Sequence, residues 1–340
     1  MTTIKDLAKA AGVSITTVSR ALNGYPDVSE KTRKRIKKLA EEMGYRPNAL
    51  AQSLVLKRTN TIGVIMSEIK RSNAKDAIAF EVLCGINDRA SELDYDILLF
   101  STNPKKQSKK SYSDLCKERN VDGAILQGLR TNDPYLKEVV EQTQFPCVLI
   151  DIPVEGEWVG HVTTDNVNGT RQAIQHLVQL GHRKIAMING YDEATVSKER
   201  RFGYILALQE AGLAFDPSII YDGRFSEEGG SAAMNHILDH HPAVTAVFCA
   251  SDLMALGALQ ALEARGLKAP EAMSVVGFDN ITIASYCSPS LTTISQDRYE
   301  LGYQAAQLLI EMLEGRKVRH KIVLNNQLIV RGSSGSVPRR

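Results

Sequence analysis

A short stretch near the N-terminus combines side chains that can read DNA bases with side chains that can contact phosphates. Arg20 can donate two hydrogen bonds to guanine O6 and N7. Thr16, Thr17 and Ser19 precede it and are short donors suited to base edges or phosphates. A run rich in Lys and Arg follows at residues 31–38 and can contact backbone phosphates. These residue types predict a surface that binds nucleic acid.

Three short helices must position these side chains within residues 1–46. Gly12 breaks the first helix, Ser14 can cap the start of the second, and Ser29 can cap the third. At 100° per residue the second helix has two faces: Val18, Ala21 and Leu22 are apolar, and Thr16, Arg20 and Asn23 are polar. This layout is typical of a helix-turn-helix, whose second helix enters the major groove. The alternative is a three-helix mini-domain with a solvated basic face.

The charge distribution favours DNA binding. Residues 1–60 hold 12 Lys and Arg against 5 Asp and Glu, a balance of +7. The remaining 280 residues carry a balance of −5, which leaves the 340-residue chain at +2. A small basic head on a mildly acidic body predicts that the head meets a polyanion.

Composition excludes several other classes. Apolar residues make up 43% of the chain and charged residues 24%, as in ordinary globular proteins. No apolar run is long enough to span a membrane, and the N-terminus lacks a secretory signal. The five cysteines are scattered and form no C-x-x-C pair, which fits reduced thiols and a cytoplasmic location. Residues 47–60 are expected to form a linker with a helix that is too short to be stable alone.

From Thr61 onward, short apolar runs alternate with amphipathic helices. The strand candidates are Ile62–Met66, Ile97–Phe100, Gly123–Leu126, Cys147–Ile150, Lys184–Ile188, Ile219–Tyr221, Ala243–Phe248 and Ser274–Phe278. The helices between them include Phe80–Leu93, Val167–Leu180, Arg200–Ala211, Glu227–Asp239 and Leu253–Arg265. This alternation predicts an α/β body with parallel sheets. The loop expected at Asp151–His161 interrupts the series and favours two similar units.

Several motifs along the whole chain carry a family resemblance. They are Thr3-Ile4-Lys5-Asp6-Leu7-Ala8, Gly12-Val13-Ser14, Thr17-Val18-Ser19-Arg20-Ala21-Leu22-Asn23, Gly44-Tyr45-Arg46-Pro47-Asn48, Leu180-Gly181-His182-Arg183-Lys184-Ile185, Thr245-Ala246-Val247-Phe248-Cys249, Val276-Gly277-Phe278-Asp279 and Leu291-Thr292-Thr293-Ile294. In this order and spacing, the chain resembles the LacI/GalR family of bacterial transcriptional repressors. The resemblance implies an all-α helix-turn-helix head and a two-lobed sensor that is similar to periplasmic binding proteins.

The resemblance also implies a domain plan. It assigns residues 1–46 to the DNA-binding head, 47–60 to a hinge helix, and 61–340 to effector binding and dimerisation. One lobe is expected at about 61–162 plus 292–325, and the other at 163–291 plus the C-terminal end. The chain would cross between the lobes near 161–163, near 291–293 and after the last helix. The tail at 332–340 is rich in Ser, Gly and Arg and is expected to be disordered.

For the head, the resemblance implies contacts to a pseudo-palindromic double-stranded operator, bound by a homodimer. The residues expected to contact DNA are Thr3, Ser14, Thr16, Thr17, Ser19, Arg20, Asn23, Lys31, Arg33 and Leu54. Leu54 matches a family leucine that wedges into the minor groove, where an apolar side chain can unstack a base step. The alternative is that Leu54 packs against the protein's own body.

For the sensor, polar residues follow the predicted strands, where ligands of such folds bind. The expected effector contacts are Asp151, Arg200, Phe225, Ser251, Asp252, Asp279 and Gln296, and Phe80 is a second possible aromatic platform. Carboxylates and a guanidinium suit vicinal hydroxyls, so a sugar is favoured. Positions that hold an aromatic pair and an Arg/Thr pair in the purine-binding branch are Ile78/Ala79 and Ala194/Val196 here, which disfavours a purine. Asp252 and Asp279 have simpler roles open to them as helix and turn caps, and Phe225 has one as a core residue.

We therefore predict an allosteric, sugar-controlled repressor of carbohydrate-utilisation genes, with no enzymatic activity, cofactor, metal or membrane contact. Control by a phosphorylated carrier protein or another non-sugar effector is the alternative. A sugar-binding protein or enzyme without a DNA role fits less well, because common catalytic motifs are absent. His236 and His240 have metal-ligand spacing on one helix, but no third ligand is evident.

Overall fold

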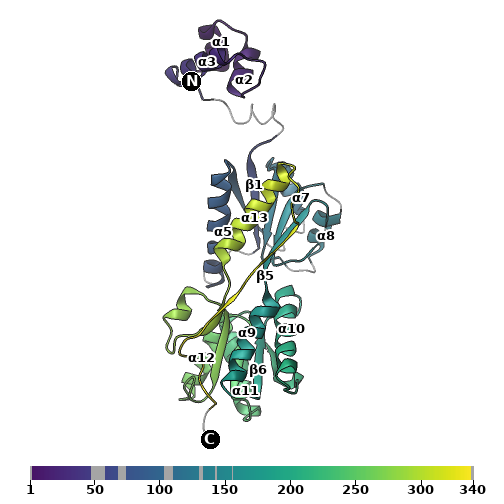
Figure 1. The fold of residues 1–340 in the computed structure, drawn as a ribbon, viewed down its shortest axis with the longest axis vertical. Helices are drawn as coiled ribbons and strands as arrows, with labels where there is room; N and C mark the ends of the chain where they lie inside the picture. The colour runs from purple at the N-terminus through teal and green to yellow at the C-terminus, as the bar shows by residue number, and fades with distance from the viewer. Residues whose placement is uncertain are drawn as a thin grey trace. The chain divides into compact units, whose positions relative to one another are not determined.

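The computed structural model describes residues 2–46, 58–67, 74–102, 110–129, 133–141, 144–154 and 156–337. Most of the predicted linker, including Leu54, therefore lies outside the described residues. The chain separates into two compact units, Met1–Thr59 and Asn60–Arg340 (Figure 1). We call them the head and the sensor and describe each by itself.

The described part of the head contains three helices, α1 (Ile4–Ala11), α2 (Ile15–Leu22) and α3 (Glu30–Glu42). Their starts are capped as predicted, because the Ser14 and Ser29 hydroxyls accept backbone N–H groups of the next turn. Gly12 ends α1 in the left-handed conformation, at φ 62°. The apolar stripe closes into a small core, whose fully buried members are Leu7, Val18, Ala21 and Ile36.

The sensor contains two six-stranded sheets, each with helices packed against it. The first sheet is parallel throughout, in the order β11-β5-β4-β3-β1-β2. Its strands are β1 (Thr61–Ser67), β2 (Asp96–Thr102), β3 (Gly123–Gln127), β4 (Cys147–Ile150), β5 (Val159–Thr164) and β11 (Lys321–Leu324). Its helices are α5 (Ala74–Glu92), α7 (Tyr112–Glu118), α8 (Pro134–Glu141) and α13 (Arg298–Leu313). We call this part the first lobe.

The second lobe repeats the plan in the order β12-β10-β9-β8-β6-β7, with only β12 antiparallel. Its strands are β6 (Ile185–Asn189), β7 (Ile220–Asp222), β8 (Ala246–Cys249), β9 (Ser274–Asp279), β10 (Thr292–Ser295) and β12 (Gln327–Ile329). Its helices are α9 (Asn166–Gln179), α10 (Thr195–Glu210), α11 (Glu227–His240) and α12 (Asp252–Ala264), with short 3₁₀ turns at Pro217–Ile219 and Thr282–Ser285. Every residue of β6, β8 and β9 is buried, as expected for strands covered on both faces. The predicted α/β architecture with two parallel-sheet units is therefore confirmed.

The chain passes between the sheets after β5, after β10, and between β11 and β12. The first two passages lie later than predicted, because β5 pairs through Thr164 and β10 through Ser295. The loop that was predicted at Asp151–His161 overlaps the start of β5. His161, Thr163 and Thr164 are buried in this strand but polar, so no apolar run marked it.

The expectation of a disordered tail is wrong for residues 332–337. Ser333 is fully buried, donates from Oγ to the Val275 carbonyl at 2.6 Å and accepts the Thr292 N–H at 2.8 Å. Its backbone also bonds to Val275 and Ser290. A serine hydroxyl thus completes the hydrogen bonding beside β9 and β10, which composition alone does not reveal.

Candidate functional site

In the head, α2 presents the polar face that the spacing predicts. Thr16 and Arg20 are exposed, whereas Val18 and Ala21 are buried against α1 and α3. A shallow hollow beside this face is lined by Ser14, Thr16, Thr17, Arg20, Asp27, Val28, Ser29 and Thr32. Ser19 is half-buried, and Lys31 is exposed on the first turn of α3. The face has the short donors and cations that DNA recognition requires.

Arg20 has a partner in the free head. Its guanidinium forms an ion pair with Asp27, from the turn that follows α2, and lies 5.8 Å from the centre of the Tyr25 ring. Both charged side chains are about half exposed. DNA would therefore have to compete with Asp27 for the guanidinium.

Several of the expected DNA contacts also have structural roles. Thr3 and Asp6 form a capping box at the start of α1, and the Ser14 hydroxyl accepts the Thr17 N–H. Asn23 is the last, capping residue of α2. Arg33 donates to the Tyr25 and Val28 carbonyls at 2.7 and 3.4 Å, so its guanidinium holds the turn after α2. Arg33 is therefore less available to phosphates than its sequence position suggests.

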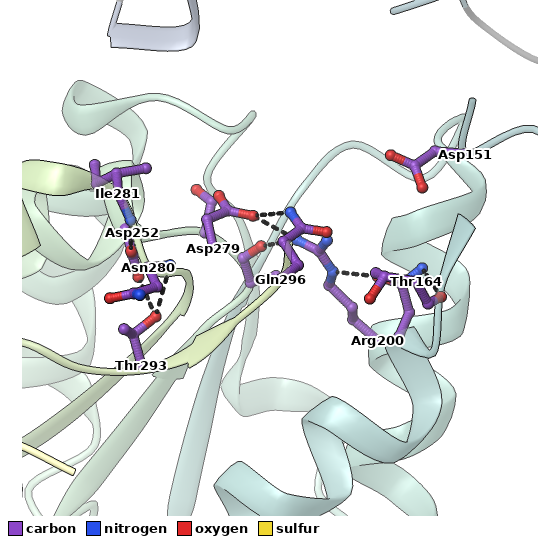
Figure 2. A network of polar contacts seen from close by, with 12 residues as sticks. Asp151, Thr164, Arg200, Asp252, Asp279, Asn280, Ile281, Thr293 and Gln296 are labelled. Atoms are coloured by element: carbon purple, nitrogen blue, oxygen red, sulfur yellow. Dashed lines mark hydrogen bonds and ion pairs between the residues drawn. The ribbon is translucent and has the colours of Figure 1, made fainter. Parts of the chain in front are cut away.

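In the sensor, Arg200 lies at the centre of a buried polar cluster (Figure 2). Its Nε donates to the Asn166 side chain at 2.9 Å, and one terminal nitrogen donates to the Ala250 carbonyl at 2.5 Å. The same nitrogen lies 3.8 Å from an Asp279 carboxylate oxygen, and the guanidinium stacks 3.7 Å from the centre of the Phe278 ring. Arg200 belongs to the second turn of α10, not to its start as predicted, because α10 begins at Thr195.

Asp279 ends β9 with a strained backbone. Its φ is 122°, a conformation that residues with a side chain rarely adopt. Gln296 donates to its carboxylate at 2.6 Å, and Arg298 donates to its backbone carbonyl at 2.6 Å (Figure 2 shows Asp279 with Gln296 and Arg200). Such strain persists only where the surroundings hold it, which is common at ligand-binding sites.

Two of the expected effector contacts, Ser251 and Asp252, form hydrogen bonds within the protein. The Ser251 hydroxyl accepts the Met254 N–H and caps α12. Asp252 is fully buried and accepts from the Ile281 N–H at 2.8 Å and the Thr293 hydroxyl at 2.5 Å. The helix-capping role considered for Asp252 therefore belongs to Ser251, and tertiary hydrogen bonds explain the position of Asp252 without a ligand.

On the first lobe, Asp151 directly follows β4, has φ 62° and accepts the Thr163 hydroxyl at 2.9 Å. Glu199, next to Arg200, accepts from the Asn166 side chain at 2.8 Å.

Burial raises the pKa of the Asp151, Glu199, Asp252 and Asp279 carboxyls. The positive charge of Arg200 opposes this rise for Asp151 and Asp279, and burial lowers the pKa of Arg200 itself.

Several of the buried polar atoms without a hydrogen-bond partner lie at or near the ends of strands and the starts of helices in the two lobes. They are Gln127 Oε1, Asn189 Oδ1, Ser197 Oγ, Gln296 Oε1 and Arg298 Nε. Gln127 and Asn189 end parallel strands of the two sheets, Gln296 follows a third strand, and Ser197 lies in the first turn of α10. Buried polar groups are nearly always hydrogen-bonded, so each such atom calls for a partner. A polar ligand with several hydroxyls would provide one.

Phe225 is half-buried in a left-handed turn, at φ 52°, and its ring covers the backbone of Gly190. It meets the Tyr191 ring edge-on, with centroids 5.3 Å apart. Phe80, the second possible platform, is 63% exposed. The structure thus places Phe225 beside the end of β6 and gives Phe80 no enclosing contacts of that kind.

Three residues of the cluster were not predicted: Asn166, Glu199 and Arg298. Asn166 follows β5, a strand that was not predicted, and Glu199 is adjacent to the predicted Arg200. Arg298 begins α13 only two residues after Gln296. The rule that ligands lie at the carboxyl ends of strands would have pointed to Asn166 and Arg298 once β5 and β10 were recognised.

Neither a cluster of metal-ligating side chains nor a membrane-spanning helix is found among the described residues. No group of three or more His, Cys, Asp and Glu side chains there could hold a metal ion. His236 and His240 stack on each other, with ring centroids 4.1 Å apart. Among the described helices, none is long and apolar enough to cross a membrane.

The combination of a helix-turn-helix head with a two-lobed binding-protein fold defines a class of ligand-responsive DNA-binding regulators. Comparisons with known proteins give the family. Residues 3–48 match the model of bacterial regulatory proteins of the lacI family, and residues 174–334 match a periplasmic binding protein-like domain. The chain belongs to the LacI family: it is a helix-turn-helix transcriptional regulator and not an enzyme.

Three relatives illustrate this membership. The HTH-type transcriptional repressor CytR of Escherichia coli K12 is 37% identical, over 99% of this chain and 97% of its own. The structure of a complex of the regulator CelR with cellobiose has a TM-score of 0.74 at 33% identity, and covers 98% of this chain and 100% of its own. The lac repressor dimer bound to operator and an anti-inducer has a TM-score of 0.79 at 28% identity, over 98% and 99%.

Proposed function

We propose that the protein is a homodimeric repressor of carbohydrate-utilisation genes, and that a small sugar bound between the two lobes controls its affinity for a pseudo-palindromic operator. The observation that carries the sugar assignment is the set of unpartnered buried atoms on both lobes, two of which belong to Gln296 and Arg298, the hydrogen-bond partners of Asp279. Their donors and acceptors match vicinal hydroxyls, which both donate and accept. The cellobiose bound to CelR, at 33% identity, supports a sugar in a site of this fold.

The operator would be read by the α2 face. Arg20 and Thr16 are the proposed base readers, and Lys31 is a proposed phosphate contact. The lac repressor neighbour is a dimer bound to operator, which supports the same assembly for this chain. A symmetric dimer requires two half-sites related by a two-fold axis.

Effector binding would act through the linker. Closure of the lobes on the sugar would shift the balance between ordered and disordered linker states, so that sugar and operator change each other's affinity by the same factor. Leu54 is the proposed minor-groove wedge. We expect Leu54→Ala to weaken operator binding strongly and to leave sugar binding intact, because the lost wedge acts only on DNA. Unchanged operator affinity in a gel-shift titration would reject this role.

Operator selection followed by a sugar panel tests the proposal. Full-length protein is used to select its site from random duplexes, and ribose, glucose, cellobiose, maltose and sucrose are then screened by thermal shift. We expect one sugar to raise the melting temperature with concentration and to change operator affinity. If no sugar does either, and a phosphorylated carrier protein changes operator affinity instead, the non-sugar alternative is correct.

A further inference from the structure

Arg298 connects the two lobes through a buried side chain. It is the first residue of α13 in the first lobe, and its side chain is only 2% exposed. One terminal nitrogen lies 3.0 Å from the Glu81 carboxylate on α5, in the same lobe. The other donates at 2.6 Å to the backbone carbonyl of Asp279, at the end of β9 in the second lobe. Arg298 therefore holds one group from each lobe.

The bond to Asp279 falls on a strained peptide. Asp279 has φ 122° and Asn280 has φ 54°, so this turn needs external contacts to keep its shape. The carboxylate of Asp279 is held separately, by Gln296 and by the charge of Arg200. Because Arg298 fixes the carbonyl, it also fixes the direction in which the Asp279 side chain leaves the backbone.

The protein's own contacts do not use all of the donors of Arg298. Its Nε is buried and has no hydrogen-bond partner. A purely structural arginine in a closed core is expected to have its donors satisfied. This donor remains available to a ligand, so the guanidinium can take part in the effector site as well as in the lobe contact.

On the first lobe, Glu81 lies on a helix that is locked to α13. A Cβ at Gly85 of α5 would lie 2.0 Å from the Tyr299 carbonyl oxygen, and a Cβ at Gly302 of α13 would lie 2.0 Å from the Val82 carbonyl oxygen. The two helices thus touch backbone to backbone and lie side by side (Figure 1). Such a pair is expected to shift as one body when either helix is displaced.

We propose that Arg298 is a positioning residue that holds Asp279 in its ligand-binding orientation and passes the effector signal to the α5–α13 pair through Glu81. This proposal rests on the effector site proposed above. The two contacts of Arg298 then have different effects. The hydrogen bond to the Asp279 carbonyl governs sugar affinity, and the ion pair with Glu81 governs how strongly the sugar changes operator affinity.

Full-length variants Arg298→Met, Arg298→Lys and Glu81→Gln test this, with Arg265→Met as the matched control. Arg265 pairs with Asp239 on the second lobe, away from the cluster. The probe is the sugar from the panel that gives the largest thermal shift. We expect Arg298→Met to weaken its binding by about 10-fold or more, because a charged hydrogen bond is lost. Arg298→Lys should restore part of this, since an ammonium can still reach the Asp279 carbonyl.

Glu81→Gln separates positioning from mere stability. We expect its sugar affinity to stay within about 3-fold of the wild type, since an exposed partner contributes little to binding. The sugar-induced change in operator affinity should instead shrink by about 10-fold. Equal sugar affinity in Arg298→Met and Arg265→Met, or a full operator response in Glu81→Gln, would overturn the proposal.

A readout without sugar distinguishes failure of this proposal from failure of the proposed function. Hydrogen exchange of the unliganded Arg298→Met protein should become faster at residues 279–282 and at residues 81–86, but not in Arg265→Met. If no sugar binds and this exchange pattern is seen, the sugar assignment fails and the lobe connection stands. Unchanged exchange at both segments rejects the lobe connection, whatever the ligand.

Discussion

The head and the sensor each contain an arginine–aspartate ion pair at a proposed binding surface. The pair in the head is exposed to solvent, and the pair in the sensor is buried. Arg20 and Asp27 are 51% and 48% exposed in the head. Arg200 and Asp279 are 4% and 8% exposed in the sensor. The first pair is screened by water and salt, so DNA can replace Asp27 at little cost. The second has lost its hydration, so it depends on fixed protein neighbours to satisfy its charges.

With the function proposed above, this difference would let one chain scan DNA and still bind an effector selectively. An exposed pair exchanges partners easily and supports fast, salt-dependent association. A buried pair is held by fixed contacts, here Asn166, Gln296 and the Ala250 carbonyl, and discriminates by geometry. Substitutions in the two pairs should therefore differ in size and in the function they affect.

The largest effect is expected for Asp279→Asn. The amide cannot provide the charge that Arg200 faces, and it can turn a donor toward the sugar hydroxyls. We expect sugar affinity to fall by about 100-fold, and operator affinity without sugar to stay unchanged. Calorimetric titration and a gel-shift assay measure the two quantities.

Asp239→Asn is the matched control for that change, because Asp239 pairs with Arg265 on the surface of the same lobe. It should leave both affinities unchanged. Loss of sugar binding in Asp239→Asn as well would mean that any such substitution disturbs the second lobe. The proposed direct contact between Asp279 and the sugar would then be unsupported.

The next largest effect is expected for Arg20→Met. It removes the proposed bidentate contact to guanine, so affinity for the selected operator should fall by about 10- to 100-fold. Affinity for random duplex of the same length should fall much less, since the phosphate contacts remain. Fluorescence anisotropy on both duplexes gives the ratio, and an equal loss on both would reduce Arg20 to a phosphate contact.

A smaller effect concerns pH and Asp252. Burial raises the pKa of this carboxyl, so the folded protein retains a proton that the unfolded chain releases. The associated stability is complete below the unfolded pKa, near 4, and is lost as pH rises through the folded value. In Asp252→Asn the amide oxygen can accept the Ile281 N–H, the amide nitrogen can donate to the Thr293 hydroxyl, and the side chain has no proton to lose. Melting temperatures from pH 5 to 8 should therefore shift in favour of the variant as pH rises.

Asp239→Asn again provides the control for the pH series. Its hydrogen bond to Arg265 lowers the pKa of Asp239, so the carboxyl stays ionised in both states above pH 5. The difference between this variant and the wild type should be flat over the same range. A difference between wild type and Asp252→Asn that is also flat would show that Asp252 titrates normally in the fold.

Much of this organisation could be predicted from the sequence, and the misses have physical reasons. The capping serines, Gly12 and the apolar face of α2 are local signals, and local signals define the head. Strands with unbroken apolar runs, such as β4, were also found. β5 was missed because its buried residues include His161, Thr163 and Thr164, which bond to neighbouring segments rather than follow an apolar pattern.

The residues of the candidate site also divide into those that could be predicted from the sequence and those that could not. Arg200, Asp279 and Gln296 were predicted from their places after strands, and the structure brings them together. Asp252 was predicted by the same rule, but its acceptors are used by Ile281 and Thr293, which are distant in sequence. The position of Arg298 after β10 could have been noticed from the sequence, but its bridge between Glu81 and Asp279 exists only in the folded sensor. Sequence position locates the edge of a sheet, whereas tertiary hydrogen bonds decide which side chains remain free for a ligand.

The smallest effect is expected for Asp27→Asn, which changes the exposed pair and leaves the fold intact. Exposed ion pairs contribute about 0–1 kcal/mol, so the head's melting temperature should barely move. Releasing Arg20 and removing a negative charge near the phosphates should raise affinity for random duplex by about 3-fold. Affinity for the operator should rise somewhat more than this, because the guanine contact no longer competes with Asp27 for the guanidinium. The ratio of operator affinity to random-duplex affinity, measured by anisotropy at fixed salt, should therefore increase. A variant that gains equally on both duplexes would show that Asp27 acts only as a charge, and a variant that loses affinity for both would show that DNA needs the ion pair intact.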